Sequence, residues 1–222
     1  MSKKVLISAG PTRERLDAVR FLSNRSSGKQ GYAIAAAAVT AGAEVTLVSG
    51  PTMLPAPIGV RVIQVESAED MLDRVKGSLP VDVAIFTAAV ADWRMEHAET
   101  GKIKKTKKGP PELKLVENPD ILSTIAHLAE GRPELVIGFA AETDQVIDYA
   151  RKKLATKGCD LIIANDVSPG KGVMGGDNNT VHVVSATGVI DWPTMTKEEV
   201  ARHLISHLAV YWMDNSESRK PE

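Results

Sequence analysis

Short apolar runs alternate with helix-like segments in this chain, and this alternation constrains the fold more than any other feature. Residues 5–9 (VLISA) read as a buried strand. An alanine-rich helix-like run covers residues 28–41 and stops at Gly42, and residues 44–49 form a second strand. Similar strand-like runs recur at residues 60–65, 81–87, 135–139 and 160–164. The sequence therefore predicts an α/β fold, a Rossmann-like and mostly parallel sheet with helices on both faces.

Two segments interrupt this alternation. Residues 93–117 contain a basic run (KIKKTKK) bounded by glycine and proline, and we expect an inserted flap or dimerisation arm there. Residues 181–185 and 189–192 predict a C-terminal hairpin, and a closing helix follows over residues 197–212. We expect one domain over residues 1–214 and a polar, frayed tail over residues 215–222.

A polar, glycine-flanked stretch at residues 20–31 connects the first strand to the first helix. In open α/β sheets such a loop meets the positive end of a helix, where phosphates bind. We expect Ser26, Ser27 and Gly28 to form the cap region of this helix. The positively charged members of the stretch are Arg20, Arg25 and Lys29. The length and polarity of the stretch favour a binding loop over an ordinary capped connection.

The charge balance argues against bulk nucleic-acid or membrane binding, because Lys and Arg number 27 against 28 Asp and Glu. No apolar run reaches membrane-spanning length, and the N-terminus runs into a strand without a secretory signal. The single cysteine, Cys159, excludes an intrachain disulfide and a cysteine-cluster metal site, and we expect it to be a small buried hydrophobe. These features favour a cytoplasmic protein.

Charged side chains gather where the predicted strands end. The cations are Arg20, Lys29, Lys102, Lys153 and Lys157, and the acids are Asp92, Glu142, Asp166 and Asp177. This mixture suits a polyphosphate with Mg²⁺, which keeps waters and takes one or two protein carboxylates. Lys153 and Lys157 share one helix face, where they either grip phosphates or complement the helix dipole.

A helix start is predicted at residues 118–121 (NPDI), with Asn118 as N-cap and Pro119 as the first helical residue. This segment either caps its helix only or also faces a ligand. Other motifs exclude common chemistries. The chain has no G-x-G-x-x-G, Walker A, H-E-x-x-H or G-x-S-x-G sequence, and Gly50 stands where a dinucleotide site would have an acid. His203 and His207 share a helix face but lack a third ligand, which favours packing over metal binding.

The residues alone thus indicate a nucleotide-using α/β enzyme. The alternatives are a Rossmann-type reductase, a non-catalytic nucleotide sensor, and a nucleic-acid binder that acts through residues 102–108. A series of motifs in sequence order narrows this choice. They are AGPTRE (9–14), LDAVR (16–20), SNRSSGK (23–29), AAVAD (88–92), KIKK (102–105), NPDI (118–121), GFAAET (138–143) and ANDV (164–167). From residue 5 to about residue 212 the chain resembles the bacterial, CTP-using phosphopantothenate–cysteine ligases.

The resemblance implies a reaction in two steps. CTP activates the carboxylate of 4′-phosphopantothenate as an acyl-cytidylate and releases pyrophosphate; the amine of L-cysteine then displaces CMP to give 4′-phosphopantothenoylcysteine. Mg²⁺ or another divalent cation is expected with CTP, with its protein ligands unassigned. The resemblance also implies a homodimer, no nucleic-acid or membrane partner, and in many members fusion to a flavin-dependent decarboxylase. The decarboxylase half is absent from this sequence, so the chain is either a free-standing ligase or an excised domain.

The resemblance assigns roles to individual positions. The implied catalytic residues are Asn24, Lys102 and Arg20. The implied CTP-binding residues are Phe86, Thr87, Ala88, Asp92, Lys102, Asn118, Pro119, Asp120, Ile121, Phe139, Lys153 and Lys157. The implied substrate-binding residues are Asn24, Ser26, Ser27 and Gly28. Gln30 stands where relatives usually have Met, and Trp93 stands where Tyr is expected, which should affect only fine packing.

Overall fold

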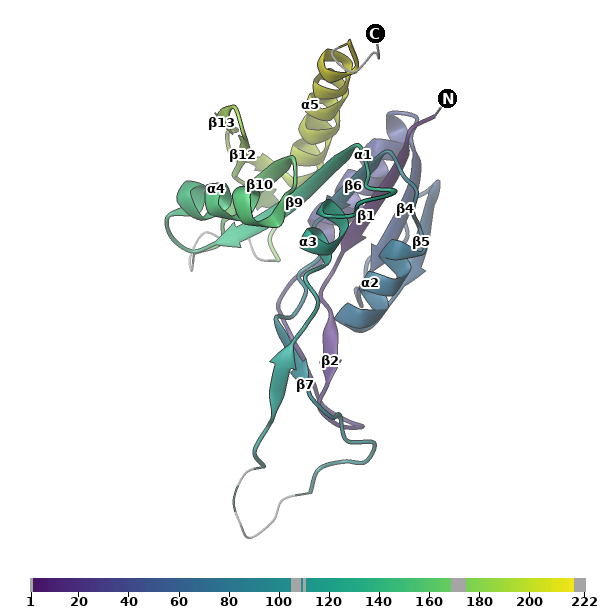
Figure 1. The fold of residues 1–222 in the computed structure, drawn as a ribbon, viewed down its shortest axis with the longest axis vertical. Helices are drawn as coiled ribbons and strands as arrows, with labels where there is room; N and C mark the ends of the chain where they lie inside the picture. The colour runs from purple at the N-terminus through teal and green to yellow at the C-terminus, as the bar shows by residue number, and fades with distance from the viewer. Residues whose placement is uncertain (1, 105–108, 110, 169–174, 218–222) are drawn as a thin grey trace.

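An eight-stranded sheet forms the centre of the protein in the computed structural model, which describes residues 2–104, 109, 111–168 and 175–217 (Figure 1). Its strands, in spatial order, are β13 (Gly188–Asp191), β12 (Val181–Ser185), β10 (Leu161–Asp166), β9 (Leu135–Glu142), β6 (Val83–Phe86), β1 (Lys4–Ala9), β4 (Glu44–Ser49) and β5 (Val60–Gln64). The strands from β10 to β5 pair in parallel, whereas β12 and β13 form an antiparallel hairpin at one edge. The predicted mostly parallel sheet and hairpin are confirmed.

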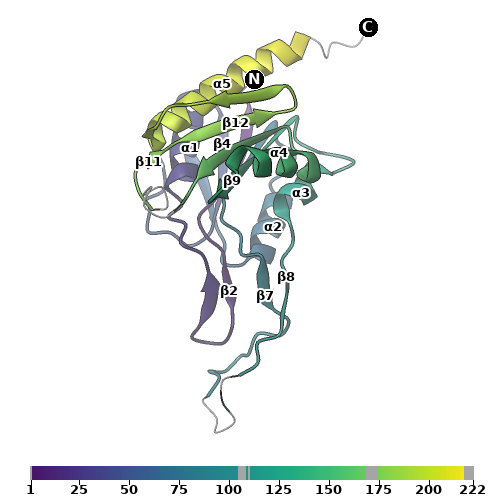
Figure 2. The same ribbon diagram turned by 90° about the vertical axis from the view of Figure 1, so that its left-hand side faces the viewer.

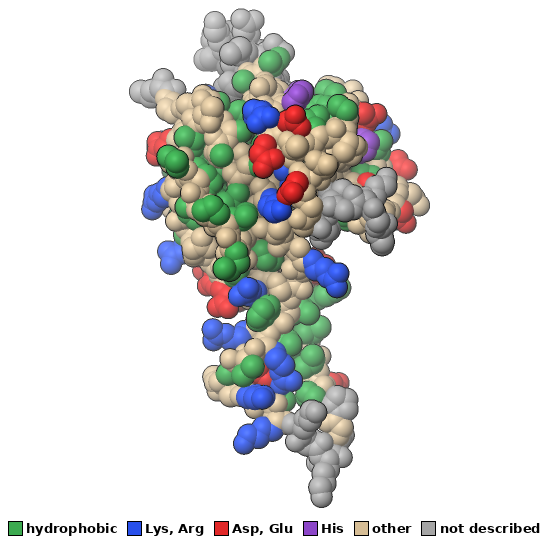
Figure 3. All heavy atoms as spheres, turned by 180° about the vertical axis from the view of Figure 1, so that it is seen from behind, with side chains coloured by type: hydrophobic (Ala, Val, Ile, Leu, Met, Phe, Trp, Pro, Cys, Tyr) green, Lys and Arg blue, Asp and Glu red, His purple; other side chains and the backbone are tan. Residues whose placement is uncertain are grey.

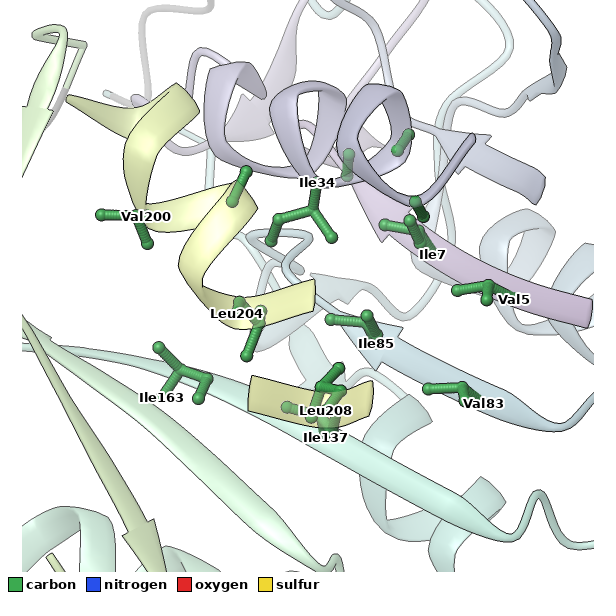
Figure 4. Close-up of a cluster of buried hydrophobic side chains, with 14 of the residues drawn as sticks. Val5, Ile7, Ile34, Val83, Ile85, Ile137, Ile163, Val200, Leu204 and Leu208 are labelled. Atoms are coloured by element: carbon green, nitrogen blue, oxygen red, sulfur yellow. The ribbon is translucent and has the colours of Figure 1, made fainter. Parts of the chain in front are cut away.

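Helices cover both faces of this sheet. The helices are α1 (Lys29–Thr40), α2 (Ala68–Lys76), α3 (Ile121–Ala126), α4 (Val146–Lys157) and α5 (Lys197–Glu217). Because successive strand residues point to opposite faces, Leu6 and Ile7 belong to different core clusters. On one face, Ile34 of α1 and Leu204 of α5 pack with Ile7 (Figure 4). On the other, α2, α3 and α4 cover the sheet, with Met71 of α2 packed among the strand residues. None of the helices in the described ranges is long and apolar enough to cross a membrane.

Two antiparallel hairpin-like elements project beyond the sheet on the same side of the molecule (Figures 1 and 2). One is the predicted arm, which pairs β7 (Trp93–Met95) with β8 (Leu115–Glu117). The other pairs β2 (Arg13–Arg15) with β3 (Phe21–Ser23), and sequence reasoning missed it because residues 13–17 resemble a polar loop. A small ladder also joins β11 (Asn178–Asn179) to β14 (Met195–Thr196). Residues 105–108 of the predicted basic run lie outside the described residues, as do residues 169–174.

The start of α3 differs from expectation, whereas the start of α1 lies in the predicted cap region. The N-cap of α3 is Asp120, whose side chain accepts a hydrogen bond from the Ser123 amide, so the predictions of Asn118 as N-cap and of Pro119 as the first helical residue are wrong. Asn118 instead donates its side-chain amide to the carbonyl of Ala91. At α1 the N-cap is Gly28, within the predicted cap region, and its φ of 77° favours glycine. The amides of Gly28 and Lys29 donate to the hydroxyls of Ser26 and Ser27 at 3.3 and 3.5 Å.

The closing helix continues through Glu217, so residues 215–217 of the predicted tail are helical and residues 218–222 lie outside the described part. Cys159 is buried, as expected, and burial raises the pKa of its thiol to about 11. The ring centroids of His203 and His207 lie 5.7 and 6.1 Å from the ring centroid of Trp192. Both histidines therefore pack against this tryptophan, in agreement with the predicted packing role.

Close packing of α1 on the sheet gives a stability prediction. A Cβ atom at Gly31 would lie 2.4 Å from Thr87 Oγ1 and 2.5 Å from Ala9 Cβ, so Gly31→Ala requires the helix or these side chains to shift. We expect a loss of about 1–3 kcal/mol in the free energy of unfolding, measured by urea denaturation. The matched control is Gly101→Ala, where no atom lies within 4 Å of the new Cβ, and we expect a change within about 0.5 kcal/mol. Equal stability of the two variants would contradict this account.

Candidate functional site

A cavity of about 750 Å³ lies where the parallel strands β1, β6, β9 and β10 end. In open α/β sheets, ligands bind at the carboxyl ends of the strands, since loops from neighbouring strands meet there. The segments that line the cavity come from the loop before α1, the loop after β6, the start of α3, the ends of β9 and β10, and α4. Residues that are distant in sequence therefore share one concave surface.

The loop after β6 forms one rigid edge of the cavity. The parallel pairing continues beyond the strands, because the Ala89 amide donates to the Gly10 carbonyl at 2.9 Å and the Thr12 amide donates to the Ala89 carbonyl at 3.2 Å. The Thr12 hydroxyl accepts from the Ala91 amide at 2.9 Å. Asn24 donates its side-chain amide to the same Ala89 carbonyl at 2.8 Å. Asn24 is thus fixed against this edge by a backbone group that can only accept.

Lysines on α4 bring positive charge to the cavity, and each is paired with a carboxylate. Lys153 Nζ lies 2.8 Å from Glu142 Oε1, and Lys157 donates to the Asp120 carboxylate. The lysine side chains retain 41% and 33% of their exposure, so these are weak, partly solvated ion pairs. A polyphosphate, which offers more oxygen acceptors than one carboxylate, can replace these partners.

Lys29, in the first turn of α1, forms a further ion pair at the cavity. Its ammonium lies 2.6 Å from Asp177 Oδ1 and donates to the Gly175 carbonyl at 3.3 Å. The hydrogen bond and charge of Lys29 lower the pKa of the Asp177 carboxyl. The start of α1 therefore carries a cation beside the amide groups that helices direct toward anions.

Lys197 is a lining residue that sequence reasoning missed. It is 6% exposed, and its ammonium donates to the Gly176 carbonyl at 2.5 Å. Burial lowers the pKa of this ammonium, and the nearby Lys29 charge adds to the effect. One signal was present in the sequence: Lys197 opens α5, where the helix dipole disfavours a cation, so some other interaction was needed to justify it.

An apolar wall with a spare polar acceptor closes another part of the cavity. Phe86, Ile121, Leu122 and Phe139 contribute apolar surface to the lining. Asn118 Oδ1 is buried and has no hydrogen-bond partner, while the amide nitrogen of the same side chain is held by the Ala91 carbonyl. A planar heterocycle that carries an amino group fits such a wall, because it stacks on apolar surface and donates to the spare oxygen.

Carboxylates in the cavity lining limit how a divalent cation can bind. They are Asp92, Glu117 and Asp120, and Asp120 is already paired with Lys157. No group of three or more His, Cys, Asp or Glu side chains suited to a metal occurs among the described residues. Mg²⁺ commonly takes one or two carboxylates and completes its shell with water and phosphate oxygens, so Asp92 fits a cation that arrives with a nucleotide.

The structure brings most of the predicted site residues together. The predicted residues that line the cavity are Asn24, Ser26, Ser27, Gly28, Phe86, Thr87, Ala88, Asp92, Asn118, Pro119, Asp120, Ile121, Phe139, Lys153 and Lys157. Arg20 and Lys102 are not among the lining residues. Arg20 is bound to Asp17 and to the Ile103 carbonyl, and Lys102 is exposed on the arm.

Comparison with known proteins places this arrangement in a family. The model of the DNA/pantothenate metabolism flavoprotein C-terminal domain matches residues 1–211. A relative named coenzyme A biosynthesis bifunctional protein CoaBC, from Vibrio parahaemolyticus, is 50% identical over 179 residues, which are 79% of this chain and 45% of the relative. The protein of the same name from Escherichia coli K12 is 46% identical over 207 residues, 92% of this chain and 51% of the relative. The chain thus spans about half the length of these relatives.

A solved structure is similar over almost its whole length. The crystal structure of the C-terminal domain of coenzyme A biosynthesis bifunctional protein CoaBC superimposes with a TM-score of 0.80 and 44% sequence identity, covering 96% of each chain. At this coverage and TM-score, the two chains share the same fold over almost their whole lengths.

The α4 lysines yield a binding prediction. Lys153→Gln should weaken the binding of inorganic tripolyphosphate about tenfold, because one charge-assisted hydrogen bond is lost. The measurement is isothermal titration calorimetry at fixed salt. Lys152→Gln is the matched control, since Lys152 is exposed on the same helix but does not line the cavity, and its effect should stay within about twofold. Equal losses in both variants would mean that α4 acts only through its overall charge.

Proposed function

We propose, since this chain belongs to the family of the DNA/pantothenate metabolism flavoprotein C-terminal domain, that it is a CTP-using phosphopantothenate–cysteine ligase. The reaction joins 4′-phosphopantothenate to L-cysteine through an acyl-cytidylate, with CMP and pyrophosphate as products. The observation that carries the proposal is a single cavity that combines paired lysines, an apolar wall with a spare acceptor, and Asn24 fixed beside a helix N-terminus.

CTP would lie between the apolar wall and α4. The cytosine amino group donates to Asn118 Oδ1, and Phe139 contributes to the apolar surface around the ring. Lys153 and Lys157 exchange their carboxylate partners for the triphosphate. Asp92 would hold a Mg²⁺ ion that arrives with the nucleotide, and the charge of that ion would offset the charge of the phosphates.

The acid substrate would enter from the α1 side. Its phosphate lies at the start of α1, where Ser26, Ser27 and Gly28 line the cavity and Lys29 supplies a cation. Its carboxylate must approach the α-phosphate of CTP, which brings two anions together. Asn24 is placed to donate to the acyl oxygen without adding charge, which favours the developing acyl-cytidylate. The amine of cysteine then attacks that carbonyl carbon and displaces CMP.

A second copy of the chain is part of this proposal. Arg20 and Lys102 lie on the projecting elements, away from the cavity lining, and exposed apolar side chains accompany them. The apolar side chains are Val19 at 62%, Phe21 at 48%, Leu113 at 44% and Leu115 at 43% exposure. Hydrophobic and basic side chains lie next to each other along this part of the molecule (Figure 3). We propose that the arms of two subunits pair to form a homodimer.

The proposal extends to the setting of the ligase. Residues 1–214 would act as one ligase unit in the cytoplasm, where CTP, cysteine and the phosphorylated acid are available. A flavin-dependent decarboxylase would be its partner where the two activities are joined in one protein. Neither nucleic acid nor a membrane has a role in this reaction.

Pyrophosphate release tests the function directly. Protein is mixed with 4′-phosphopantothenate, Mg²⁺ and either CTP or ATP, with and without cysteine. We expect release with CTP that becomes sustained when cysteine is added, since cysteine clears the acyl-cytidylate. The same assay should show that Asn24→Asp lowers turnover about 100-fold or more, because a carboxylate cannot donate to the acyl oxygen.

Controls separate chemistry from folding. Asn178→Asp makes the same chemical change at an exposed position outside the cavity lining and should leave turnover within about twofold. Far-ultraviolet circular dichroism should be equal for both variants. Nucleotide binding without pyrophosphate release would sink the ligase proposal and favour a nucleotide sensor, and full turnover by Asn24→Asp would refute its assigned role.

Dimerisation gives a separate prediction. Leu115→Asp places a charge on the exposed face of β8, so it should raise the dimer dissociation constant about 30-fold or more, equivalent to about 2 kcal/mol. Sedimentation equilibrium measures this constant. Ile58→Asp, at a side chain that is 96% exposed and outside the projecting elements, should leave it unchanged. A monomeric wild-type protein would contradict the proposed assembly without bearing on the cavity.

A further inference from the structure

Asp17 is a buried carboxylate that the proposed reaction leaves unused. Its side chain has no exposed surface, although it lies in the turn between β2 and β3. Oδ1 accepts hydrogen bonds from the amides of Val19 and Arg20, each at 2.8 Å. Two of its interactions are therefore local and close the turn, as aspartate commonly does in such loops.

The other carboxylate oxygen of Asp17 serves the arm. The Ile103 amide, which lies 86 positions further along the chain, donates to Oδ2 at 3.0 Å. Arg20 donates to the same oxygen through Nε at 3.0 Å and Nη2 at 2.5 Å. Nη2 also donates to the Ile103 carbonyl at 3.1 Å. Both backbone polar groups of Ile103 are thus held by one pair of side chains.

This arrangement orients the residue before Ile103. Ile103 is half-buried, whereas Lys102 and Lys104 on either side of it are exposed. A backbone that is fixed at both its amide and its carbonyl cannot rotate freely, so the direction of the neighbouring Lys102 side chain is restricted. A further contact, from the Glu99 amide to the Leu16 carbonyl at 3.3 Å, ties the same part of the arm to the turn.

The charge on Asp17 persists over the working pH range. Hydrogen bonds from Arg20, and then from backbone amides, hold the pKa of this carboxyl far below its usual range, against the opposing effect of burial. A lowered pKa in the folded state means that the stabilisation is complete above the ordinary aspartate pKa and is lost only as the pH falls through the lowered value. Mild acid therefore does not break the hydrogen bond from the Ile103 amide to the Asp17 carboxylate.

We propose that Asp17 is a positioning residue that fastens the arm through Ile103 and so orients Lys102 for the ligation, with Arg20 as the second half of the clamp. The orienting role rests on the proposed function, because it is in that reaction that Lys102 acts. The docking of the arm onto the turn stands on the hydrogen bonds alone. Arg20 thereby has a structural partner on the arm in addition to any contact with substrate.

Two variants disrupt the clamp, one on the β2–β3 turn and one on the arm, and a third variant is the control. Asp17→Asn removes the charge that holds Arg20, and Ile103→Pro removes the amide donor while leaving the turn intact. Lys104→Pro is the matched control, because it places proline beside Ile103 and keeps the clamped amide. The first readout is amide hydrogen exchange of the segment 96–104, which should rise at least about tenfold in the first two variants only.

The second readout is kinetic. We expect kcat to fall about 100-fold in Asp17→Asn and Ile103→Pro, since misplacing a reacting group by about 1 Å costs this much. Tripolyphosphate binding should stay unchanged, because the α4 lysines are not part of the clamp. Adding Lys102→Gln to Asp17→Asn should cost little more, since both changes remove the same oriented lysine. If Asp17 only stabilised the fold, Asp17→Asn would weaken tripolyphosphate binding, and its loss of kcat would add to that of Lys102→Gln.

The outcomes separate the clamp from the ligase proposal. Unchanged exchange in Asp17→Asn and Ile103→Pro, or additive losses with Lys102→Gln, would overturn the clamp. A wild-type protein without CTP-dependent turnover would remove the ligase function and the orienting role of Asp17 with it. In that case, exchange that rises in the two clamp variants but not in Lys104→Pro would still establish the docking of the arm.

Discussion

The parallel pairing of β4, β1, β6 and β9 is the constraint on which the rest of the structure depends. Strands that run in one direction place all their carboxyl ends at one edge, so the segments that follow Ala9, Phe86 and Glu142 meet there. Main-chain hydrogen bonds extend this pairing past the strands, from Gly10 and Thr12 to Ala89. The edge of the cavity is therefore held by main-chain hydrogen bonds that continue the pairing of the sheet.

Ion pairing inside the cavity keeps its positive charge in place without a ligand. Lys153 and Lys157 each have a carboxylate partner, so their side chains are ordered and their mutual repulsion is reduced. These pairs are partly solvated and individually weak, so a phosphate can displace the carboxylates at little cost. Lys197 is different, because it is buried and bound to backbone, and its pKa is lowered by burial.

Buried acids tie the β2–β3 element to the body and to the arm in a way that their sequence context does not reveal. Glu14 is 2% exposed and accepts a hydrogen bond from the Ala68 amide at the start of α2, while Asp17 receives the Ile103 amide of the arm. Both acids sit in a short polar stretch that resembles an ordinary loop. Each has a partner far away in sequence, Ala68 for Glu14 and Ile103 for Asp17, and a buried carboxylate is retained only where its hydrogen-bond partners exist.

Local patterns in the sequence determined the order and type of the main elements, because the apolar periodicity of strands and helices is a property of consecutive residues. The stop of the first helix near Gly42 was readable in the same way, and α1 does end at Thr40, with Ala41 as its C-cap. The motifs also pointed to the residues that now line the cavity, although their roles in catalysis are still predictions.

Only the tertiary structure decided that Asn118 contacts Ala91 instead of capping α3, and that Lys197 lines the cavity. It also placed Arg20 against the arm. These outcomes depend on contacts between distant segments, which form only once the chain is packed.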